Sequence, residues 1–230
     1  MTEHRVSVVM ATLNAERFLA ESLGSVTAQS LPVLEIIVVD GGSSDATAEI
    51  AATFPKTRVL RQKTRGFAAA WNEGIQAAHG SLIALIDSDD RWPPDKLRFQ
   101  VERLSRLPGA DVVLGHVRFF LTGAAPAHFK PGLLERPHPG HMPGALLARR
   151  SVFDRVGWFE DRWAIASDFD WFARIVDSGI PTAMLDEVVL EKRVHQSNLS
   201  YTTARTPVVR REILDALRDS VHRKRSQERS

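Results

Sequence analysis

Apolar runs alternate with amphipathic stretches through the first half of the chain. Short runs rich in Val, Ile and Leu occur at 6–11, 34–39, 58–60 and 81–86. The segments that follow them, 15–29, 45–53, 66–79 and 93–107, carry apolar residues at helical spacing. Near-continuous apolar strands separated by helices predict an α/β fold with a mostly parallel sheet that has helices on both faces.

The pattern changes after residue 111. A longer strand is predicted at 112–121, a short one at 144–148 and a last one at 182–194, with helices at 151–156 and 167–178 between them. The stretch 122–143 is rich in Gly, Pro and His and is longer than an ordinary connection, so it is either functional or mobile. We expect this loop and residues 144–166 to influence which molecule the protein selects, because variable loops on a rigid scaffold usually carry specificity.

A basic amphipathic helix is predicted at 206–223, with Ile213, Leu214, Leu217 and Val221 on one stripe. Residues 205–230 hold eight Lys or Arg against four Asp or Glu, whereas the rest of the chain holds 22 against 24. Two interpretations stay open, a helix packed on the body with a solvated face and a helix that touches anionic lipid or a partner. A nucleic-acid partner is disfavoured because the tail lacks interleaved aromatic residues.

Composition limits the class of protein. A chain of 230 residues that is 43% hydrophobic and 25% charged is typical of a folded domain. The absence of cysteine excludes disulfides and zinc–thiolate sites. Neither a signal peptide nor a membrane-spanning stretch is recognisable, so we expect a cytoplasmic protein, with peripheral contact at the inner face of the membrane left open.

Three carboxylates, Asp87, Asp89 and Asp90, follow directly after the apolar run 82–86. Clustered negative charge at the end of a buried strand is costly unless a cation lies beside it. The carboxyl ends of strands are where α/β sheets bind ligands, and Mg²⁺ or Mn²⁺ carrying a phosphate suits such carboxylates. Asp-X-Asp triplets also cap helices and line solvated turns, so the motif by itself leaves both interpretations open.

A second aspartate, Asp40, ends the strand at 34–39 and precedes the turn Gly41-Gly-Ser-Ser44. We expect it to face the same crevice as Asp87, because the carboxyl ends of parallel strands share one edge of the sheet. The alternative is that Asp40 only closes the turn through its own side chain.

Several motifs occur in order along the chain. They are Val6-Ser-Val-Val-Met-Ala-Thr-Leu-Asn14, Ile36-Ile-Val-Val-Asp-Gly-Gly-Ser-Ser-Asp-Ala-Thr47, Trp71-Asn-Glu-Gly-Ile75, Leu85-Ile-Asp-Ser-Asp-Asp-Arg-Trp92, Arg150–Glu160, Ser167–Arg174 and Arg193–Ser200. Together they resemble glycosyltransferase family 2, which has the GT-A fold, over roughly residues 5–200. The resemblance implies a GT-A domain at 1–204, with a nucleotide-binding half at 1–110 and an acceptor and catalytic half at 111–204, followed by the basic helix and tail at 205–230.

The resemblance also implies an inverting, metal-dependent transfer of a sugar from a nucleotide diphosphate, UDP above all, to an acceptor hydroxyl. Nucleotide-sugar binding falls on matched positions: Thr12, Asn14, Asp40, Arg65, Asp87 and Ser88. Mn²⁺ or Mg²⁺ would be held by Asp89, Asp87 and His195. The chain has Leu13 where the family often has an aromatic residue. His195 could instead be a surface histidine in a polar loop.

Asp168 matches the base that deprotonates the acceptor hydroxyl in this family. The residue before it is Ser167, where the family usually has Glu. The alternative is that Asp168 only caps the helix that begins near it. Asp170 and Arg174 are four residues apart and are expected to form a pair along the helix.

Two other functions compete with this prediction. A nucleotidyltransferase has a related fold, but that class usually carries a Gly-rich loop with Arg or Lys after the first strand, which residues 11–17 lack. A catalytically inactive binding or scaffold protein is the second alternative. The presence of Asp40, Asp87, Asp89 and Asp168 together argues against it.

Overall fold

The structure, a computed structural model, describes residues 5–107, 109–127, 129–198 and 207–227. The strands are β1 (Val6–Thr12), β2 (Glu35–Asp40), β3 (Thr57–Arg61), β4 (Leu82–Leu85), β5 (Val112–Leu121), β6 (His138–Pro139), β7 (Leu147–Arg149) and β8 (Thr182–Val194). The helices are α1 (Glu16–Thr27), α2 (Thr47–Ala52), α3 (Phe67–Ala77), α4 (Lys96–Arg106), α5 (Ser151–Val156), α6 (Ser167–Asp177) and α8 (Pro207–Gln227), with short 3-10 turns η1 (Pro131–Leu134) and η2 (Pro143–Ala145). The domain boundary expected at 204 lies outside the described residues.

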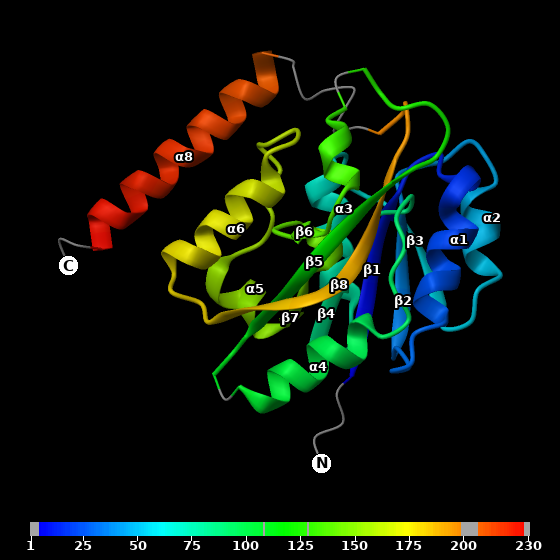
Figure 1. Cartoon of the computed structure of the whole chain (residues 1–230), viewed down its shortest axis with the longest axis horizontal. Helices are drawn as coiled ribbons and strands as arrows, with labels where there is room; N and C mark the ends of the chain where they lie inside the picture. Colours follow the sequence, from blue (N-terminus) through cyan, green and yellow to red (C-terminus); the bar gives the residue numbers. More distant parts are fainter. Residues whose placement is uncertain (1–4, 108, 128, 199–206, 228–230) are drawn as a thin grey trace.

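One sheet organises the molecule (Figure 1). Its strands follow the order β3-β2-β1-β4-β7-β5-β6, and β8 pairs with β5. The pairs β3-β2, β2-β1 and β1-β4 are parallel, whereas β7 runs antiparallel to both β4 and β5. The chain order reverses between β1 and β4, so a crevice is expected outside the carboxyl ends of these two strands.

Both faces of the sheet are covered, as the strand pattern predicts. Along β1, Val8 and Met10 pack in the cluster that includes residues of α1, α2 and α4, whereas Val9 and Ala11 pack in the cluster that includes residues of α3, α5 and α6. Strand residues that point to alternate sides therefore feed two separate cores. The α/β architecture expected from the sequence is confirmed.

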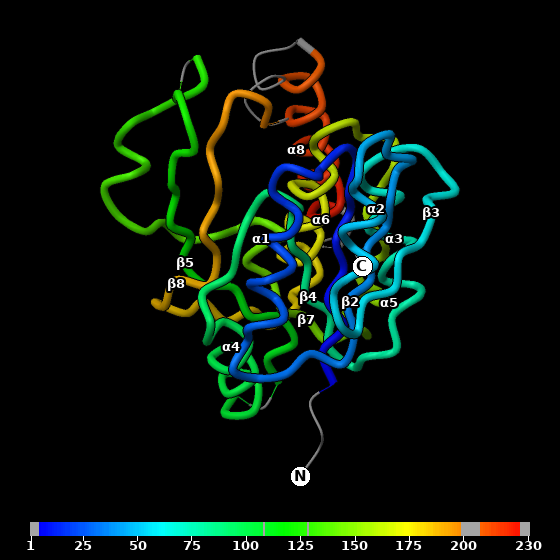
Figure 2. The backbone as a smooth tube through the Cα atoms, turned by 90° about the vertical axis from the view of Figure 1, so that its right-hand side faces the viewer, coloured from blue at the N-terminus to red at the C-terminus, as the bar shows by residue number. Residues whose placement is uncertain are grey.

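The loop after β5 includes short ordered pieces. η1 and the two-residue strand β6 lie within 122–143, and η2 begins at Pro143. The backbone of 122–127 and 129–137 projects away from the sheet beside the paired strands β5 and β8 (Figure 2).

The helix predicted over 66–79 ends two residues early, and Gly80 has another role. Helix α3 ends at Ala77, and Gly80 instead lies against β1, where an added Cβ would come 2.6 Å from the carbonyl oxygen of Arg5. The glycine is there because the chain must pass close to the backbone of the strand.

Helix α8 packs on α6, but not through its aliphatic stripe. Val209 and Ala216 are its buried apolar residues, whereas Ile213, Leu214, Leu217 and Val221 are 37–50% exposed. Within the described part of the chain, no helix is both long enough and apolar enough to span a bilayer.

Candidate functional site

The loops after β1 and β2 form one side of the crevice. The Asp40 carboxylate is buried, and its Oδ2 accepts hydrogen bonds from the backbone N–H groups of Gly42 (3.2 Å) and Ser43 (3.1 Å). Asp40 therefore closes its own turn, and these hydrogen bonds do not test its predicted contact with a nucleotide. Thr12 is its register partner at the end of β1 and donates its hydroxyl to the Val39 carbonyl at 3.4 Å.

Asn14 joins the two loops. Its backbone has a φ of 49°, which asparagine tolerates better than most residues, and its N–H donates to Ser43 Oγ at 2.9 Å. Its side-chain oxygen accepts the N–H of Ser44 at 2.9 Å. The residues predicted to contact the nucleotide thus fix the shape of the loop, while the Leu13 side chain beside them is 62% exposed.

Arg65 lies exposed at the start of α3, just before Gly66. The Gln62 side chain connects this segment to the Asp40 turn, because its amide donates to the Gly66 carbonyl at 2.6 Å and its oxygen lies close to Gly41. Arg65 therefore sits at the rim of the predicted nucleoside site.

The three aspartates after β4 converge. Asp87, Asp89 and Asp90 each offer a carboxylate oxygen, and these atoms lie within 4.8 Å of one another. Asp87 Oδ1 is buried and has no hydrogen-bond partner among the described residues. A buried carboxylate oxygen without a donor, beside two more carboxylates, fits a hard divalent cation. Ser88 lies between them and is half-buried.

Strand β8 supplies a cation to this cluster. Lys192 Nζ donates to Asp87 Oδ2 (3.0 Å) and to Asp90 Oδ2 (2.8 Å). Asp90 is fully buried, and its second oxygen accepts the backbone N–H of Arg193 at 2.8 Å. Asp90 therefore anchors β8 to the Asp-rich turn. Sequence reasoning overlooked Lys192, although a lysine on the same face of the strand as the buried Leu190 and Val194 was a signal.

The charges in this cluster shift one another. Burial raises the pKa of Asp90 to about 7; the Lys192 ammonium opposes the rise, and the carboxylates of Asp89 and Asp87 add to it. Burial alone would lower the pKa of Lys192, but the neighbouring carboxylates outweigh it and hold that pKa well above its usual value. Lys192 therefore stays charged beside the aspartates.

His195 follows β8 and meets Asp89. Its Nε2 lies 3.0 Å from Asp89 Oδ2, which also accepts a hydrogen bond from the Asn198 amide at 2.9 Å. The ring is buried against Phe18 of α1, with 4.9 Å between the ring centroids. The alternative of a surface histidine is therefore wrong, and Asp89 and His195 form a pair of potential metal ligands.

Asp168 lies in the first turn of α6, and Ala166 rather than Asp168 is the N-cap of that helix. Its Oδ1 accepts the N–H of Phe169 at 2.7 Å. Burial raises the pKa of Asp168 to about 6, and the Asp87 carboxylate adds to the rise while Lys192 opposes it. The predicted base is therefore within electrostatic reach of the acidic cluster.

An ion pair and a set of hydrogen bonds fix the residues on either side of Asp168. Asp170 is buried and pairs with Arg174 (Oδ2 to Nε, 2.8 Å), so the predicted helix pair is confirmed. The segment before α6 is held by Glu212 of α8, whose carboxylate accepts the N–H groups of Ala164 (2.9 Å), Ile165 (2.9 Å) and Ala166 (3.2 Å).

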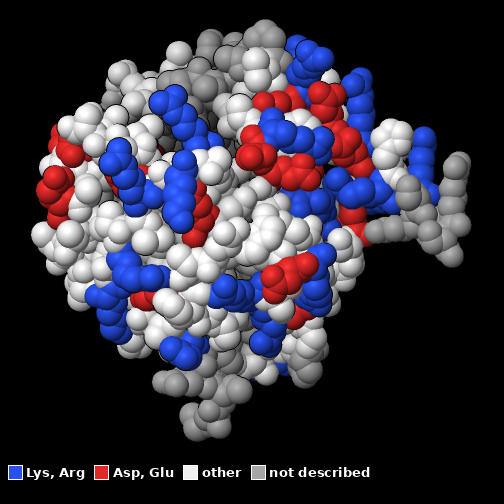
Figure 3. All heavy atoms as spheres, turned by 180° about the vertical axis from the view of Figure 1, so that it is seen from behind, with Lys and Arg blue, Asp and Glu red and all other residues white. Residues whose placement is uncertain are grey.

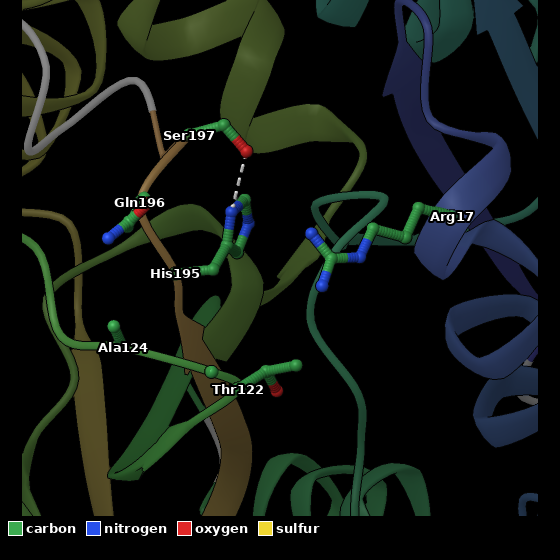
Figure 4. Close-up of a pocket in the computed structure, with 7 residues that line it drawn as sticks. Arg17, Thr122, Ala124, His195, Gln196 and Ser197 are labelled. Atoms are coloured by element: carbon green, nitrogen blue, oxygen red, sulfur yellow. Dashed lines mark hydrogen bonds between the residues drawn. The ribbon is translucent and has the colours of Figure 1, made fainter.

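A pocket of about 360 Å³ opens on the other side of His195 (Figure 4). It is lined by Arg17, Thr122, Gly123, Ala124, His195, Gln196 and Ser197. Arg17 and His195 point toward each other across it, and Ser197 Oγ lies 2.8 Å from His195 Nδ1. Residues 122–124, at the start of the 122–143 loop, therefore line the pocket together with His195, and the same histidine contacts Asp89 of the acidic cluster through Nε2.

The comparisons with known proteins agree with the motifs. The family model for glycosyl transferase family 2 matches residues 7–159. A protein of Mycobacterium bovis, Mb1547, is 32% identical over 248 aligned residues that cover 97% of this chain and 70% of that protein. Several other curated relatives, 34–40% identical, match over 94–103 residues, which is 27–40% of their length. The chain therefore spans only part of these relatives.

Solved structures share the fold at low identity. TarS of S. aureus in complex with UDP-GlcNAc superposes with a TM-score of 0.73 and 18% identity, over 95% of this chain and 66% of that chain. Glucosyl-3-phosphoglycerate synthase of Mycobacterium tuberculosis, in complex with Mn²⁺, UDP and glucosyl-3-phosphoglycerate, gives a TM-score of 0.67 and 20% identity, over 94% of this chain and 80% of that chain.

Proposed function

The chain belongs to glycosyltransferase family 2, and from this premise we propose that it moves a sugar from UDP to an acceptor hydroxyl, with inversion at the anomeric carbon. One observation carries the proposal. Asp168, whose pKa is raised to about 6, lies within electrostatic reach of Asp87, in an acidic cluster at the carboxyl end of β4. A base close to a potential diphosphate site is the arrangement that glycosyl transfer requires.

The donor would lie along the carboxyl ends of β1, β2 and β4. The proposal places the nucleoside against Thr12, Asn14 and Asp40, with Arg65 at the rim and Ser88 beside the diphosphate. The location of these residues at the reversal of strand order supports the assignment. The UDP and UDP-GlcNAc complexes of proteins that share the fold support a uridine nucleotide.

The acidic cluster fits a divalent ion, Mn²⁺ or Mg²⁺. Asp89, Asp87 and His195 would hold it, and the partnerless Asp87 Oδ1 supports this choice. When bound, the ion would offset the charge that builds on the diphosphate as the glycosidic bond breaks. Lys192 adds a permanent positive charge between Asp87 and Asp90, so part of the cluster is already neutralised when the donor arrives.

Asp168 would take the proton of the acceptor hydroxyl as that oxygen attacks the anomeric carbon. With a pKa of about 6, the carboxylate is mostly ionised at pH 7 and is still a stronger base than an ordinary aspartate. General-base catalysis of this kind typically contributes about 10²–10⁴ in rate.

A donor screen tests the proposal. The protein is incubated with UDP-, GDP- and dTDP-sugars, with and without Mn²⁺ or Mg²⁺, and the release of nucleoside diphosphate and the thermal shift with each nucleotide are measured. We expect metal-dependent release of UDP from at least one UDP-sugar. No release from any sugar, together with no shift with any nucleotide, would refute the enzyme assignment. Release of pyrophosphate from a nucleoside triphosphate would favour a nucleotidyltransferase instead.

Two substitutions separate the proposed roles. Asp168→Asn should lower turnover by about 10²–10⁴ and keep nucleotide affinity, because the base contacts the acceptor rather than the nucleotide. Asp89→Ala should weaken Mn²⁺-dependent nucleotide binding. Asp154→Asn, at an exposed position in α5, is the matched control and should change neither. Loss of nucleotide binding in Asp168→Asn would show that the base is misassigned.

A further inference from the structure

The solvated face of α8 is unusual for a surface helix. Such a helix normally turns its aliphatic stripe toward the core, because burying a Leu or Ile side chain stabilises a protein by about 1.5–3 kcal/mol. Here Leu214, Leu217 and Val221 are 44–50% exposed, and Ile213 is 37% exposed. Each of these four side chains therefore leaves between a third and a half of its surface in water.

The body holds the opposite face of α8 mainly through polar contacts. Glu212 binds the backbone of 164–166, Asp219 pairs with Arg162 at 2.7 Å, and Arg223 pairs with Asp177 at 2.9 Å. Among the described side chains of this helix, 208–225, only Val209 and Ala216 are apolar and buried. Its orientation is therefore fixed by specific ion pairs and hydrogen bonds, and these turn the aliphatic stripe outward.

Basic side chains also lie on the outward side of the helix. Arg210, Arg211, Arg218 and Arg225 are exposed beside the aliphatic stripe. Asp215 is the acidic residue among them, and it pairs with Arg218 at 3.0 Å. In Figure 3, basic side chains stand along the right-hand edge that α8 forms, and acidic ones gather on its inner side. The outward surface is thus aliphatic and positively charged at once.

We propose that the outward face of α8 binds the surface of an anionic lipid bilayer, with the aliphatic stripe at the level of the headgroups and the arginines paired with lipid phosphates. An aliphatic stripe next to basic residues that reach past it is the arrangement of helices that lie in a membrane interface. A second copy of the chain is a poorer occupant, because two such faces would bring their arginines together. The proposal does not depend on the reaction assigned to the site.

Vesicle sedimentation tests this surface with the full chain. The protein is mixed with sucrose-loaded vesicles of phosphatidylcholine alone or of phosphatidylcholine with about a third phosphatidylglycerol, a composition chosen to give a strongly anionic surface. We expect binding to the anionic vesicles, at least tenfold weaker binding to the neutral ones, and loss of binding in high salt. No binding to anionic vesicles at low salt would overturn the proposal.

Matched variants locate the binding surface. Leu214→Ser/Leu217→Ser and Arg211→Gln/Arg218→Gln/Arg225→Gln alter exposed side chains and should keep the circular dichroism spectrum. The arginine variant should bind anionic vesicles about a hundredfold more weakly, since each basic residue near such a surface contributes roughly fivefold. The control, Arg103→Gln/Arg106→Gln/Leu107→Ser, changes a similar exposed set at the end of α4 and should bind like the parent protein.

Two results would point to another occupant. Equal binding by the parent and both α8 variants would show that a different surface meets the lipid. A stable dimer that the Leu214→Ser/Leu217→Ser variant abolishes, without vesicle binding, would assign the face to a second copy of the chain.

Discussion

The carboxyl group of Asp168 connects the structure of the site to its chemistry. Its pKa is about 6 because burial disfavours the charged form and the Asp87 carboxylate adds to that effect. A base must be ionised to accept a proton, so we expect kcat/KM for the acceptor to rise with pH, reach half its maximum near pH 6 and stay level above pH 7. A pH–rate profile from pH 4.5 to 8.5 measures this. A midpoint near pH 4 would contradict it.

The raised pKa of Asp168 also lowers the free energy of unfolding at neutral and higher pH. The pKa of Asp168 is higher in the folded protein than its ordinary value of 3.8, so its contribution to stability is fully present below about pH 4 and is lost as pH rises through 6. Asp168→Asn should therefore raise the stability by roughly 1–2 kcal/mol at pH 8 and change it little at pH 4. That corresponds to an increase in Tm of about 2–8 °C.

Thermal unfolding at the two pH values measures this difference. Asp154→Asn serves as the control and should leave Tm unchanged at both. An equal increase in Tm for Asp168→Asn at pH 4 and pH 8 would show that packing, rather than charge, accounts for it.

The elements were predictable where the local pattern is strong. The strand at 182–194 and the helix at 151–156 have the bounds that the sequence predicts, because apolar periodicity decides both. The helix after Pro93-Pro94 starts later, at Lys96, and the one at 66–79 ends earlier, at Ala77. Their ends depend on contacts with β1 and with the segment after α1, where Gln29 accepts the N–H of Leu97, and periodicity does not describe such contacts.

The orientation of α8 shows a different limit. The sequence identifies the aliphatic stripe correctly but not the direction it faces. That direction is set by Glu212, Asp219 and Arg223, whose partners lie 46–57 residues away in the chain. The sequence around a charged helix residue does not indicate whether its side chain pairs with the body of the protein or is solvated.

The packing of α3 on the sheet gives a testable result for this element. Gly74 lies so close to β1 that an added Cβ would come 2.3 Å from Val9 Cγ1. Gly74→Ala should therefore destabilise the protein by about 1–3 kcal/mol, in spite of the better helix propensity of alanine.

Gly24→Ala in α1 is the matched control, since an added Cβ there meets no atom within 4 Å. It should leave the stability unchanged or raise it by up to about 1 kcal/mol. Chemical denaturation of both variants measures the pair. A Gly74→Ala protein as stable as the control would mean that α3 moves away from the sheet without cost.

Across the whole molecule, the site unites the two halves of the chain. Asp87, Asp89 and Asp168 were identified from the sequence because motifs mark them; the structure brings Asp87 and Asp89 together and places Asp168 within electrostatic reach of Asp87. Lys192 escaped notice because nothing local relates it to Asp90, which is 102 residues earlier. A contact of that range becomes visible only when the bridge between Arg91 and Glu191 is known.

Removing Lys192 should destabilise the contact between β8 and the turn that holds Asp87 and Asp90. Lys192→Met leaves the buried Asp90 without its cation, and breaking a buried pair in this way typically costs about 3–5 kcal/mol. The loss should be smaller near pH 5 because Asp90 can then bind a proton, and adding Asp90→Asn should restore part of it.

Urea denaturation of the single and double variants measures this coupling, with Lys130→Met at an exposed position as the control. A Lys192→Met protein as stable as that control would show that solvent replaces the lysine at little cost.

The pairing of Asp90 with Lys192 also has a consequence for the order in which the protein is made. The ribosome delivers the N-terminal half first, so the three aspartates are synthesised about a hundred residues before the lysine that neutralises them. Until then the Asp-rich turn must stay hydrated or take up protons. Burial of Asp90 beside its cation therefore has to wait for β8, and an interrupted chain that stops before β8 holds the three aspartates without their lysine.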